Sequence, residues 1–453
     1  MHRLYNQNMY NFGDPQPSYW ESTQGLCRPN GRPLVSNETY DVAIIGGGYT
    51  GLSAAYHLGR KFGIEVGVLE AGHIGWGASG RNGGFCSIGG AAGSVKDLVK
   101  RFGLSDVKAF YKSQVDAIEL VKEIITDNNI DASIQGESEL YVAHSKKAFN
   151  ELNELKNFYS QSLGLDARNI SSEEFRDLHF DSTEQYGALE LKPTFGLHPM
   201  RYINGLAVAA EHYGAKLYPY SEVQSWEKKG DYHTLHVSSG SIRAKHVIFA
   251  TNGFMPETLH KNFTSRSLPV ISSIIVTRPL SNLELDAYQW KTLSPAINSR
   301  KLMNYFRLLP DKRFLFGGRG SSSGDKKGET RNYEYLTARM KSIWPEWKDI
   351  EIDYCWHGFV CFTRRLTPAI GRLSDDKSIF FGFGYHGNGV NTSTWVGKQL
   401  AIWLASNNMP ASISRLSQGL SPKFPFAPFR RHYLQAIMTW YRVQDSLRYI
   451  DLR

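Results

Sequence analysis

The segment "YDVAIIGGGYTGLSAAYHLGRKFGIEVGVLEAG", which begins at Tyr40, constrains the fold more than any other part of the chain. Val42 to Ile45 form a short apolar run typical of a buried parallel strand, and glycines follow at once. From Leu52 to Leu58 apolar residues recur at roughly helical spacing, and "IEVGVLE" has the pattern of a second strand. The sequence therefore predicts a strand–helix–strand unit of an α/β fold.

The glycines of this unit have the spacing of a dinucleotide-binding turn. Gly46, Gly48 and Gly51 fit G-x-G-x-x-G, in which the first glycine allows the turn, the second admits a pyrophosphate and the third lets the helix pack on the strand. The helix N-terminus offers amides and a positive dipole to phosphates. Glu70 ends the second strand, where a carboxylate accepts hydrogen bonds from ribose hydroxyls and disfavours a 2′-phosphate.

The unit thus predicts NAD or FAD, and an α/β turn without a ligand is the alternative. The contacts expected from this unit are Gly46, Gly48, Tyr49, Thr50, Gly51, Glu70 and Ala71.

The next segment, "GASGRNGGF" from Gly77 to Phe85, is rich in glycine. Ordering such a segment costs much backbone entropy, so it persists only where its amides or unusual dihedrals are used. A flexible surface loop is the alternative. A simple NAD-binding unit would continue into another helix and strand, whereas this chain continues into "GHIGWGASGRNGGFCSIGG".

This continuation resembles the glycine/D-amino-acid oxidase family of FAD-dependent oxidoreductases, in which the segment wraps the flavin end of FAD. Three later stretches follow in the family's order: "HPMRYINGLAVAAEHYGAKLYPYSEVQSW", "HVIFATNGF" and "IFFGFGYHGNGVNTSTWVGKQLA". The resemblance covers roughly residues 40–406, and "SYW", "GASGRNGG" and "YFRLLPDKRFLFGGR" are most similar to the gamma-glutamylputrescine oxidoreductase branch. It implies further FAD contacts at Ser79, Gly80, Arg81, Asn82, Gly83, Gly84, Val223, Thr251, Asn252, Gly253, Gly387, Asn388, Gly389 and Val390.

The resemblance also implies a reaction. An amine or amino-acid-derived substrate, such as a gamma-glutamylated amine, would pass a hydride to the flavin and give an imine that hydrolyses, with oxygen or another acceptor taking the electrons. Two alternatives stay open: a flavin-dependent dehydrogenase with a non-oxygen acceptor, and a non-catalytic dinucleotide-binding scaffold.

Because the FAD segments are scattered, the domains are expected to be discontinuous. We expect a Rossmann-like α/β FAD-binding domain beside a substrate domain built on a mixed or antiparallel sheet, α+β overall. The division runs as follows: an N-terminal extension (1–39), the FAD-binding domain (40–105, 195–258 and 350–410), the substrate domain (106–194 and 259–349) and a C-terminal helical tail (411–453).

Three residues are candidates on the substrate side. "PVISSIIVTRPL" and "MNYFRLLPDKRFLFGG" read as strands, the second as a hairpin turning at "PDKR". Tyr305 and Arg307 share a face of one strand, so Arg307 either pairs with a substrate carboxylate or is structural. His386 stands where the family usually has a small residue, and it either accepts a substrate proton or bonds to backbone in a tight turn.

The four cysteines form no CxxC pair, so no disulfide framework or metal site is expected. Some family members attach their flavin through a cysteine in the strand that precedes a threonine, and Cys361 lies in that neighbourhood. When the sequences are aligned on Thr363, however, Cys361 lies one residue later than the family's cysteine, and a one-residue offset turns a side chain to the opposite face of a strand. Cys86 ends a loop that works through backbone and polar groups. We therefore expect noncovalent FAD.

The net charge of +9 raises the question of an anionic partner. The basic residues are spread along the chain, so nucleic acid is not expected. No apolar run is long enough to span a membrane and no secretory signal is evident, which leads us to expect a cytoplasmic protein. The aromatic and basic segment "FRRHYLQAIMTWYRVQDSLRYI" could lie at a membrane surface, but we expect it to pack on its own domain.

Overall fold

Two eight-stranded sheets organise the computed structural model, which describes residues 3–450. The first sheet has the order β17 (Ala369–Arg372), β18 (Ile379–Phe383), β11 (Gly240–Phe249), β1 (Asn37–Ile45), β2 (Val66–Leu69) and β8 (Lys216–Tyr218), with β10 (Tyr232–Val237) and β9 (Ser225–Lys229) attached to β11. Its centre is parallel, because β1 pairs in parallel with both β11 and β2. This is the predicted strand–helix–strand unit, and its helix is α2 (Tyr49–Phe62).

The second sheet is mostly antiparallel and contains the predicted hairpin. Its order is β16 (Ile352–Thr363), β12 (Ser267–Pro279), β15 (Arg313–Arg319), β14 (Tyr305–Leu308), β13 (Ala296–Asn298), β4 (Glu139–Val142), β6 (Ala188–Leu191) and β5 (Ala167–Ile170). The strands β14 and β15 turn at "PDKR", as predicted. A short pair, β3 (Phe85–Cys86) with β7 (Phe195–Gly196), lies outside both sheets. The α/β and α+β prediction is confirmed.

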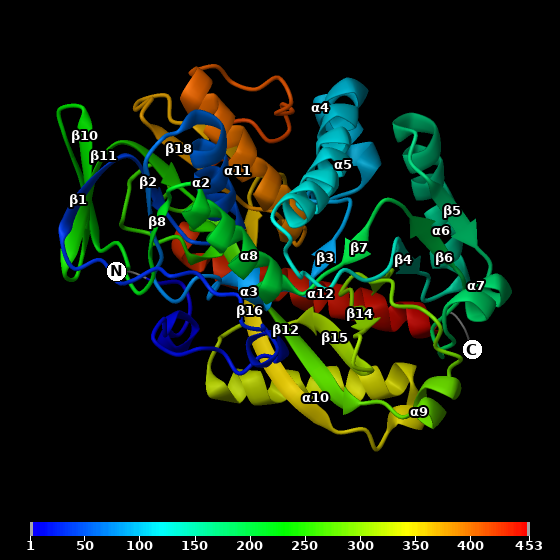
Figure 1. Cartoon of the computed structure of the whole chain (residues 1–453). Coiled ribbons are helices and arrows are strands. Elements are labelled where there is room, and N and C mark those ends of the chain that lie inside the picture. The colour runs from blue at the N-terminus through cyan, green and yellow to red at the C-terminus, as the bar shows by residue number, and fades with distance from the viewer. Residues whose placement is uncertain (1–2, 451–453) are drawn as a thin grey trace.

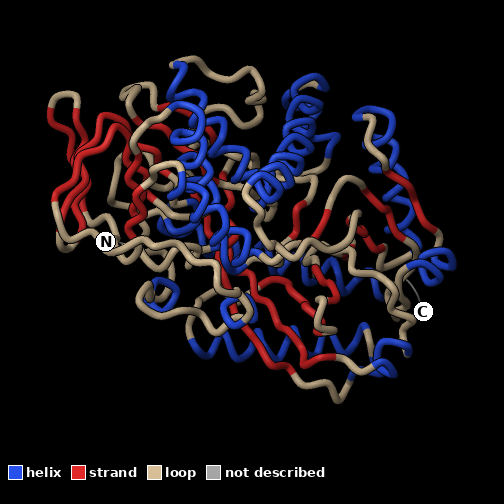
Figure 2. Tube along the Cα trace, in the orientation of Figure 1, coloured by secondary structure: helices blue, strands red, loops and turns tan. Residues whose placement is uncertain are grey.

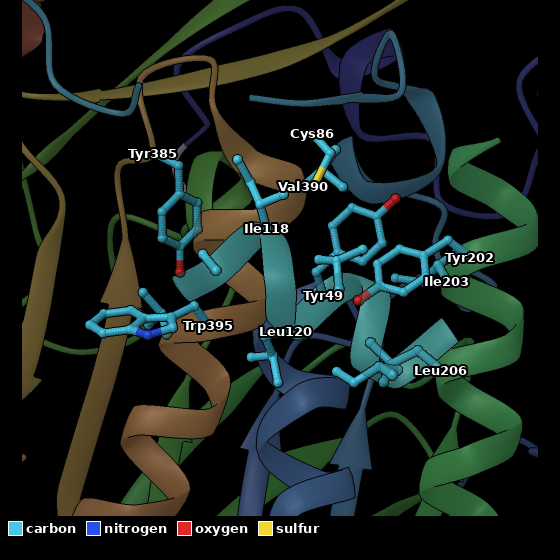
Figure 3. Close-up of a cluster of buried hydrophobic side chains, with 14 of the residues drawn as sticks. Tyr49, Cys86, Ile118, Leu120, Tyr202, Ile203, Leu206, Tyr385, Val390 and Trp395 are labelled. Atoms are coloured by element: carbon cyan, nitrogen blue, oxygen red, sulfur yellow. The ribbon is translucent and has the colours of Figure 1, made fainter. Parts of the chain in front are cut away.

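Long helices cover both sheets (Figures 1 and 2). The helices α2, α5 (Leu104–Asp127), α8 (Pro199–His212) and α11 (Gly389–Ser406) pack together beside the first sheet. Figure 3 shows their shared core, where the rings of Tyr49 and Tyr202 lie 5.2 Å apart. On the second sheet, α10 (Lys326–Ile343) covers the face turned away from these helices, through Leu336, Trp344 and the strand residue Phe316.

The remaining helical elements are shorter or peripheral. They are η1 (Gln7–Tyr10), α1 (Tyr19–Ser22), α3 (Ala78–Arg81), α4 (Val95–Phe102), α6 (Lys146–Asn157), η2 (Phe158–Ser162), α7 (Ser172–Leu178), η3 (Asn252–Phe254), α9 (Asn282–Asp286), η4 (Pro345–Trp347), η5 (Ala427–Phe429) and α12 (Arg430–Ile450).

Two observations bear on the expected domain division. The segment 350–410 contributes β16 to the second sheet and β17 and β18 to the first. Among residues 3–39, the α1 residue Trp20 is 1% exposed. The division by sequence range therefore remains a proposal, and β16 lies across the boundary that it draws between the two sheets.

Candidate active site

The first part of the site is the turn between β1 and α2. Gly46 has a φ of +113°, and a Cβ there would lie 2.7 Å from the Ala250 oxygen, while a Cβ at Gly51 would clash with the Gly46 oxygen. Thus only glycine allows β1, α2 and the end of β11 to approach this closely. Among the described residues no side chain caps α2 at Gly48 and none in its first turn is acidic, although Ser79 Oγ accepts from the Tyr49 amide at 3.1 Å. Thr50 is buried behind this turn and bonds to Tyr385.

Glu70 ends β2 beside this turn. Its carboxylate accepts the Gly47 amide at 2.7 Å and the Gly72 amide at 3.1 Å, which leaves Ala71 between two held residues. The backbone oxygen of Glu70 accepts the Ser221 amide, and this bond brings Val223 to the end of β2 where Glu70 lies. Burial raises the pKa of Glu70, while the two amides counteract that effect. The structure thus gathers the residues expected around an adenosine.

The glycine-rich segment from Gly77 to Phe85 is ordered by its own asparagine. Asn82 Nδ2 donates to the Ala78 and Ser79 oxygens, and Asn82 Oδ1 accepts the Gly84 amide at 2.8 Å. Two buried indoles hold its backbone: Trp20 donates to the Asn82 oxygen and Trp356 to the Arg81 oxygen. The alternative of a flexible surface loop therefore does not apply, because the segment is fixed between the two sheets.

Gly80, Gly83 and Gly84 fit this segment into narrow space. A Cβ at Gly80 would clash with the Gly75 oxygen, and a Cβ at Gly84 would clash with the Leu197 oxygen. At Gly83 it would lie 3.1 Å from the Tyr305 ring. This last approach brings the segment directly over the second sheet.

Arg81 is buried within the segment, yet its side chain is largely unused. The guanidinium lies 3.8 Å from the centroid of the Trp76 ring, and its Nη1 makes one long hydrogen bond, 3.4 Å, to the His357 oxygen. Its Nε and Nη2 have no hydrogen-bond partner among residues 3–450. Burial lowers the pKa of Arg81 to about 9. Buried donors left unsatisfied are costly in a folded protein, so this geometry favours a ligand with acceptor atoms.

The N-terminus of α11 closes the site from another side. Gly384 donates its amide to Asn252 Oδ1 at 2.9 Å, which ties this turn to Thr251 and Gly253 at the end of β11. Asn388 bonds to the Ser87 oxygen and to Gln114, with Val390 buried behind it. A Cβ at Gly387 or Gly389 would meet no described atom within 4 Å.

His386, in the same turn, is held by backbone. Its Nε2 accepts the Thr363 amide at 3.1 Å, and its own amide donates to the Cys361 oxygen. Burial lowers the pKa of His386 to about 3. Because the accepting nitrogen is already used and the imidazolium is disfavoured, the geometry favours the structural role over proton acceptance.

Arg307 is also held by its two terminal nitrogens, although its Nε has no hydrogen-bond partner among residues 3–450. It is 1% exposed, Nη2 donates to the Leu197 oxygen at 2.6 Å, and Nη1 donates to Gln135 at 3.3 Å. The guanidinium also lies against the Trp20 ring. This arrangement favours the structural alternative for Arg307 over pairing with a substrate carboxylate.

Tyr305 lies differently, on the face of β14 that Gly83 approaches. Its hydroxyl lies 2.9 Å from Ser272 Oγ, which itself donates to the Gly318 oxygen at 2.9 Å. Since Ser272 uses its proton there, it accepts the proton of Tyr305, and the phenol oxygen keeps free lone pairs. Burial raises the pKa of Tyr305 to about 12, so the phenol stays neutral.

The sequence pattern did not single out Glu139, which shares a face of β4 with Tyr141, whereas Leu140 and Val142 pack into the hydrophobic core on the other face. It is 3% exposed, and its Oε2 has no partner among the described residues. Burial raises its pKa to about 7. No short motif marks such a residue, because its burial follows from strand pairing far along the chain.

The residues present fit FAD. The N-cap residues of the long helices α2 and α11 make no side-chain cap, and Thr50 at the start of α2 bonds to Tyr385 just before α11; anionic groups are stabilised at such helix ends. The Arg81 donors and the buried hydroxyl of Thr251 there have no partner among residues 3–450, and Gly387 and Gly389 leave open space. No group of three or more metal-ligating side chains occurs among the described residues.

These features define an oxidoreductase that binds a dinucleotide. The model of the FAD dependent oxidoreductase family, DAO, matches residues 41–403, and the chain belongs to this family. The enzyme uses FAD as its cofactor and acts on amines or amino acids.

Individual relatives agree. A probable oxidoreductase OrdL of Haemophilus influenzae is 30% identical over 384 residues, 84% of this chain and 86% of the relative. The gamma-glutamylputrescine oxidoreductase of Escherichia coli is 30% identical over 377 residues, 81% and 84% of the two chains. Among solved structures, glycine oxidase from Geobacillus kaustophilus has a TM-score of 0.71 at 20% identity, covering 86% of this chain and 100% of that chain, and supports the fold.

The cysteines agree with a noncovalent cofactor. Cys361 lies on the opposite face of β16 from Gly358, which approaches Arg81, and on the face that Gly253 approaches. Burial raises the pKa of Cys361 to about 12, so the nucleophilic thiolate is disfavoured, and Cys86 is buried with its pKa raised as well.

Proposed function

We propose that this enzyme oxidises the CH–NH group of an amine substrate, with a gamma-glutamylated amine as the leading candidate. When bound, FAD supplies the acceptor for the hydride that leaves the substrate carbon. The resulting imine is then hydrolysed by water. The name of the relative from Escherichia coli supports the substrate class.

The observation that carries the proposal is the unused acceptor on Tyr305. The substrate loses a hydride from the carbon next to its amine nitrogen, and an acceptor for the amine N–H fixes the orientation of that carbon. The phenol oxygen of Tyr305 offers lone pairs for this bond, on the face of the strand that Gly83 approaches. A Cβ at Gly317 would clash with the Tyr305 ring, so glycine lets this ring lie across the strand. In this proposal Tyr305 orients the substrate, while Arg307 and His386 have structural roles and stabilise the backbone around the site.

Anaerobic flavin bleaching tests the proposal. Purified holoenzyme is mixed with gamma-glutamylputrescine, simple primary amines and N-methyl amino acids, and the flavin absorbance near 450 nm is followed. We expect bleaching by at least one amine class. In Tyr305→Phe we expect a KM roughly ten times higher, about 1.4 kcal/mol, with unchanged FAD content. No bleaching by any amine would reject the proposal, and loss of FAD in Tyr305→Phe would make Tyr305 a cofactor residue.

A further inference from the structure

The C-terminal helix α12 packs on its own domain by one face only. Leu434 and Met438 are buried against Leu268 and Val270 of β12, as expected for a tail that covers its domain. Arg430 forms a buried ion pair with Glu257. Near the other end, Asp445 accepts the amides of Lys301 and Leu302 at 3.1 Å each. These anchors at both ends fix which face of α12 is turned outward.

The outward side of α12 carries large apolar side chains next to the exposed Gln435 and Thr439. Ile437, Trp440 and Val443 recur every third residue and are 49%, 59% and 44% exposed. Phe426 and Phe429, just before the helix, are 79% and 59% exposed. We call these five residues the apolar stripe. Trp440 and Val443 lie roughly opposite the buried Leu434 and Met438 on α12, Ile437 lies on the flank between these faces, and the two phenylalanines precede the helix.

A cluster of basic residues lies at the beginning of this stripe. Arg364 donates to the Lys423 oxygen at 3.2 Å, and Arg101 donates to the oxygen of the adjacent Arg365 at 2.9 Å. The side chains of Arg101, Arg364 and Lys423 are exposed, and none of the three takes part in an ion pair between described residues. We call these three residues the basic cluster. Lys423 precedes Phe426 by only three residues, so the basic cluster adjoins the stripe through Lys423.

We propose that the apolar stripe and the basic cluster together bind an anionic phospholipid surface, with α12 lying in the plane of the interface. Aromatic and aliphatic side chains on one face of a helix enter the boundary between headgroups and acyl chains, and basic residues attract anionic headgroups. The net charge of +9 acts in the same direction over a longer range. No described helix is long and apolar enough to cross a membrane, and a surface contact needs none.

A second copy of the chain fits this surface less well. A single helical stripe is narrow compared with stable protein interfaces, which bury about 1,200–2,000 Å². A two-fold contact through α12 would also place each basic cluster opposite the far end of the partner's helix, with no acidic group of the stripe to pair with it. An anionic surface complements the basic cluster directly, so shape and charge complementarity favour lipid.

Vesicle sedimentation tests the proposal with the full-length holoenzyme. Vesicles of phosphatidylcholine with 30 mol % phosphatidylglycerol are compared with pure phosphatidylcholine vesicles at ~0.1 M salt. We expect wild-type protein to sediment with the anionic vesicles at least five times more than with the neutral ones. In Ile437→Ser/Trp440→Ser the bound fraction falls at least fivefold, and in Arg101→Gln/Arg364→Gln/Lys423→Gln the preference for anionic vesicles disappears.

The matched control is Leu283→Ser, which removes a large apolar side chain that is 82% exposed on α9, away from the stripe. This variant should sediment like wild type, and circular dichroism verifies that each variant is folded. Equal sedimentation of wild type and Ile437→Ser/Trp440→Ser would overturn the proposal. A concentration-dependent dimer in sedimentation velocity that this variant abolishes, without vesicle binding by wild type, would assign the stripe to self-association.

Discussion

Arg81 and Arg307 are both buried arginines near the junction of the two sheets, yet their hydrogen bonding differs. Arg307 donates to a carbonyl and to Gln135 and leaves only Nε without a partner among the described residues, whereas Arg81 has two such nitrogens and a single long hydrogen bond of 3.4 Å. Burial lowers the pKa of each to about 9, so their electrostatic cost is similar. The difference teaches that burial alone does not mark a ligand site. Unused hydrogen-bonding capacity does.

The largest effect that follows from this comparison is on folding. In Arg307→Met we expect the free energy of unfolding to fall by about 2–4 kcal/mol, because the Leu197 oxygen and Gln135 lose their donor inside the protein. Urea denaturation of the FAD-free protein measures this change. Arg415→Met, whose side chain is 79% exposed, is the control and should change it by less than about 0.5 kcal/mol. A stable Arg307→Met with a strongly raised KM would restore the substrate-binding role.

Arg81 should give the converse result. In Arg81→Met we expect FAD to bind about 10- to 100-fold more weakly, about 1.4–2.7 kcal/mol, because the cofactor loses a charged donor. The FAD-free variant should be as stable as the wild type, since two of the donors it loses bonded to nothing in the protein. Fluorescence titration with FAD and urea denaturation measure the two quantities. A stability loss as large as that of Arg307→Met would erase the contrast between the two arginines.

Glu139 extends the comparison to an acid. Its folded pKa of about 7 is above the ordinary value of 4.5, so the stability it contributes as a neutral acid is present below about pH 4.5. That contribution is lost as the pH rises through about 7. We expect Glu139→Gln, which stays neutral, to gain about 1–3 kcal/mol on wild type between pH 5 and pH 8.

Urea denaturation at the two pH values provides the measurement. The control is Glu190→Gln on the neighbouring strand β6. Burial raises the pKa of Glu190, but the hydrogen bond and charge of Arg168 outweigh that effect, and the pKa is lowered. It should not show this gain. A pH-independent difference between Glu139→Gln and wild type would mean that Glu139 is ionised throughout this range.

The sequence predicted the first sheet and its cofactor turn well, because both depend on short-range patterns. Gly46, Gly48 and Gly51 lie within one turn, and their roles follow from backbone geometry that neighbouring residues define. The strand parity of Tyr305 and the hairpin at "PDKR" were predicted for the same reason.

The second sheet was less predictable, because its pairings join distant segments. The burial of Arg307 depends on Trp20, which lies about 290 positions earlier, and on the Leu197 backbone. The position of β16 in the second sheet depends on pairing with β12, and the environment of Glu139 on strands up to 170 residues away. Such partners leave no periodicity in the sequence around the residue itself.

The smallest expected effect concerns His386. Like Arg307, it is a buried group that uses hydrogen-bonding capacity within the protein, since its Nε2 accepts the Thr363 amide. Its φ of +52° is in the left-handed region, which asparagine tolerates, so His386→Asn keeps the backbone while removing the Nε2 acceptor for the Thr363 amide. We expect the free energy of unfolding to fall by about 1 kcal/mol and kcat to change less than about twofold. Because burial lowers the pKa of His386 to about 3, the ring is neutral at neutral pH, and the pH profile of kcat/KM between pH 6 and 9 should keep its shape. Steady-state kinetics over this range with the best amine substrate provides the measurement, and a kcat lowered a hundredfold together with a lost acidic limb would instead assign proton transfer to His386.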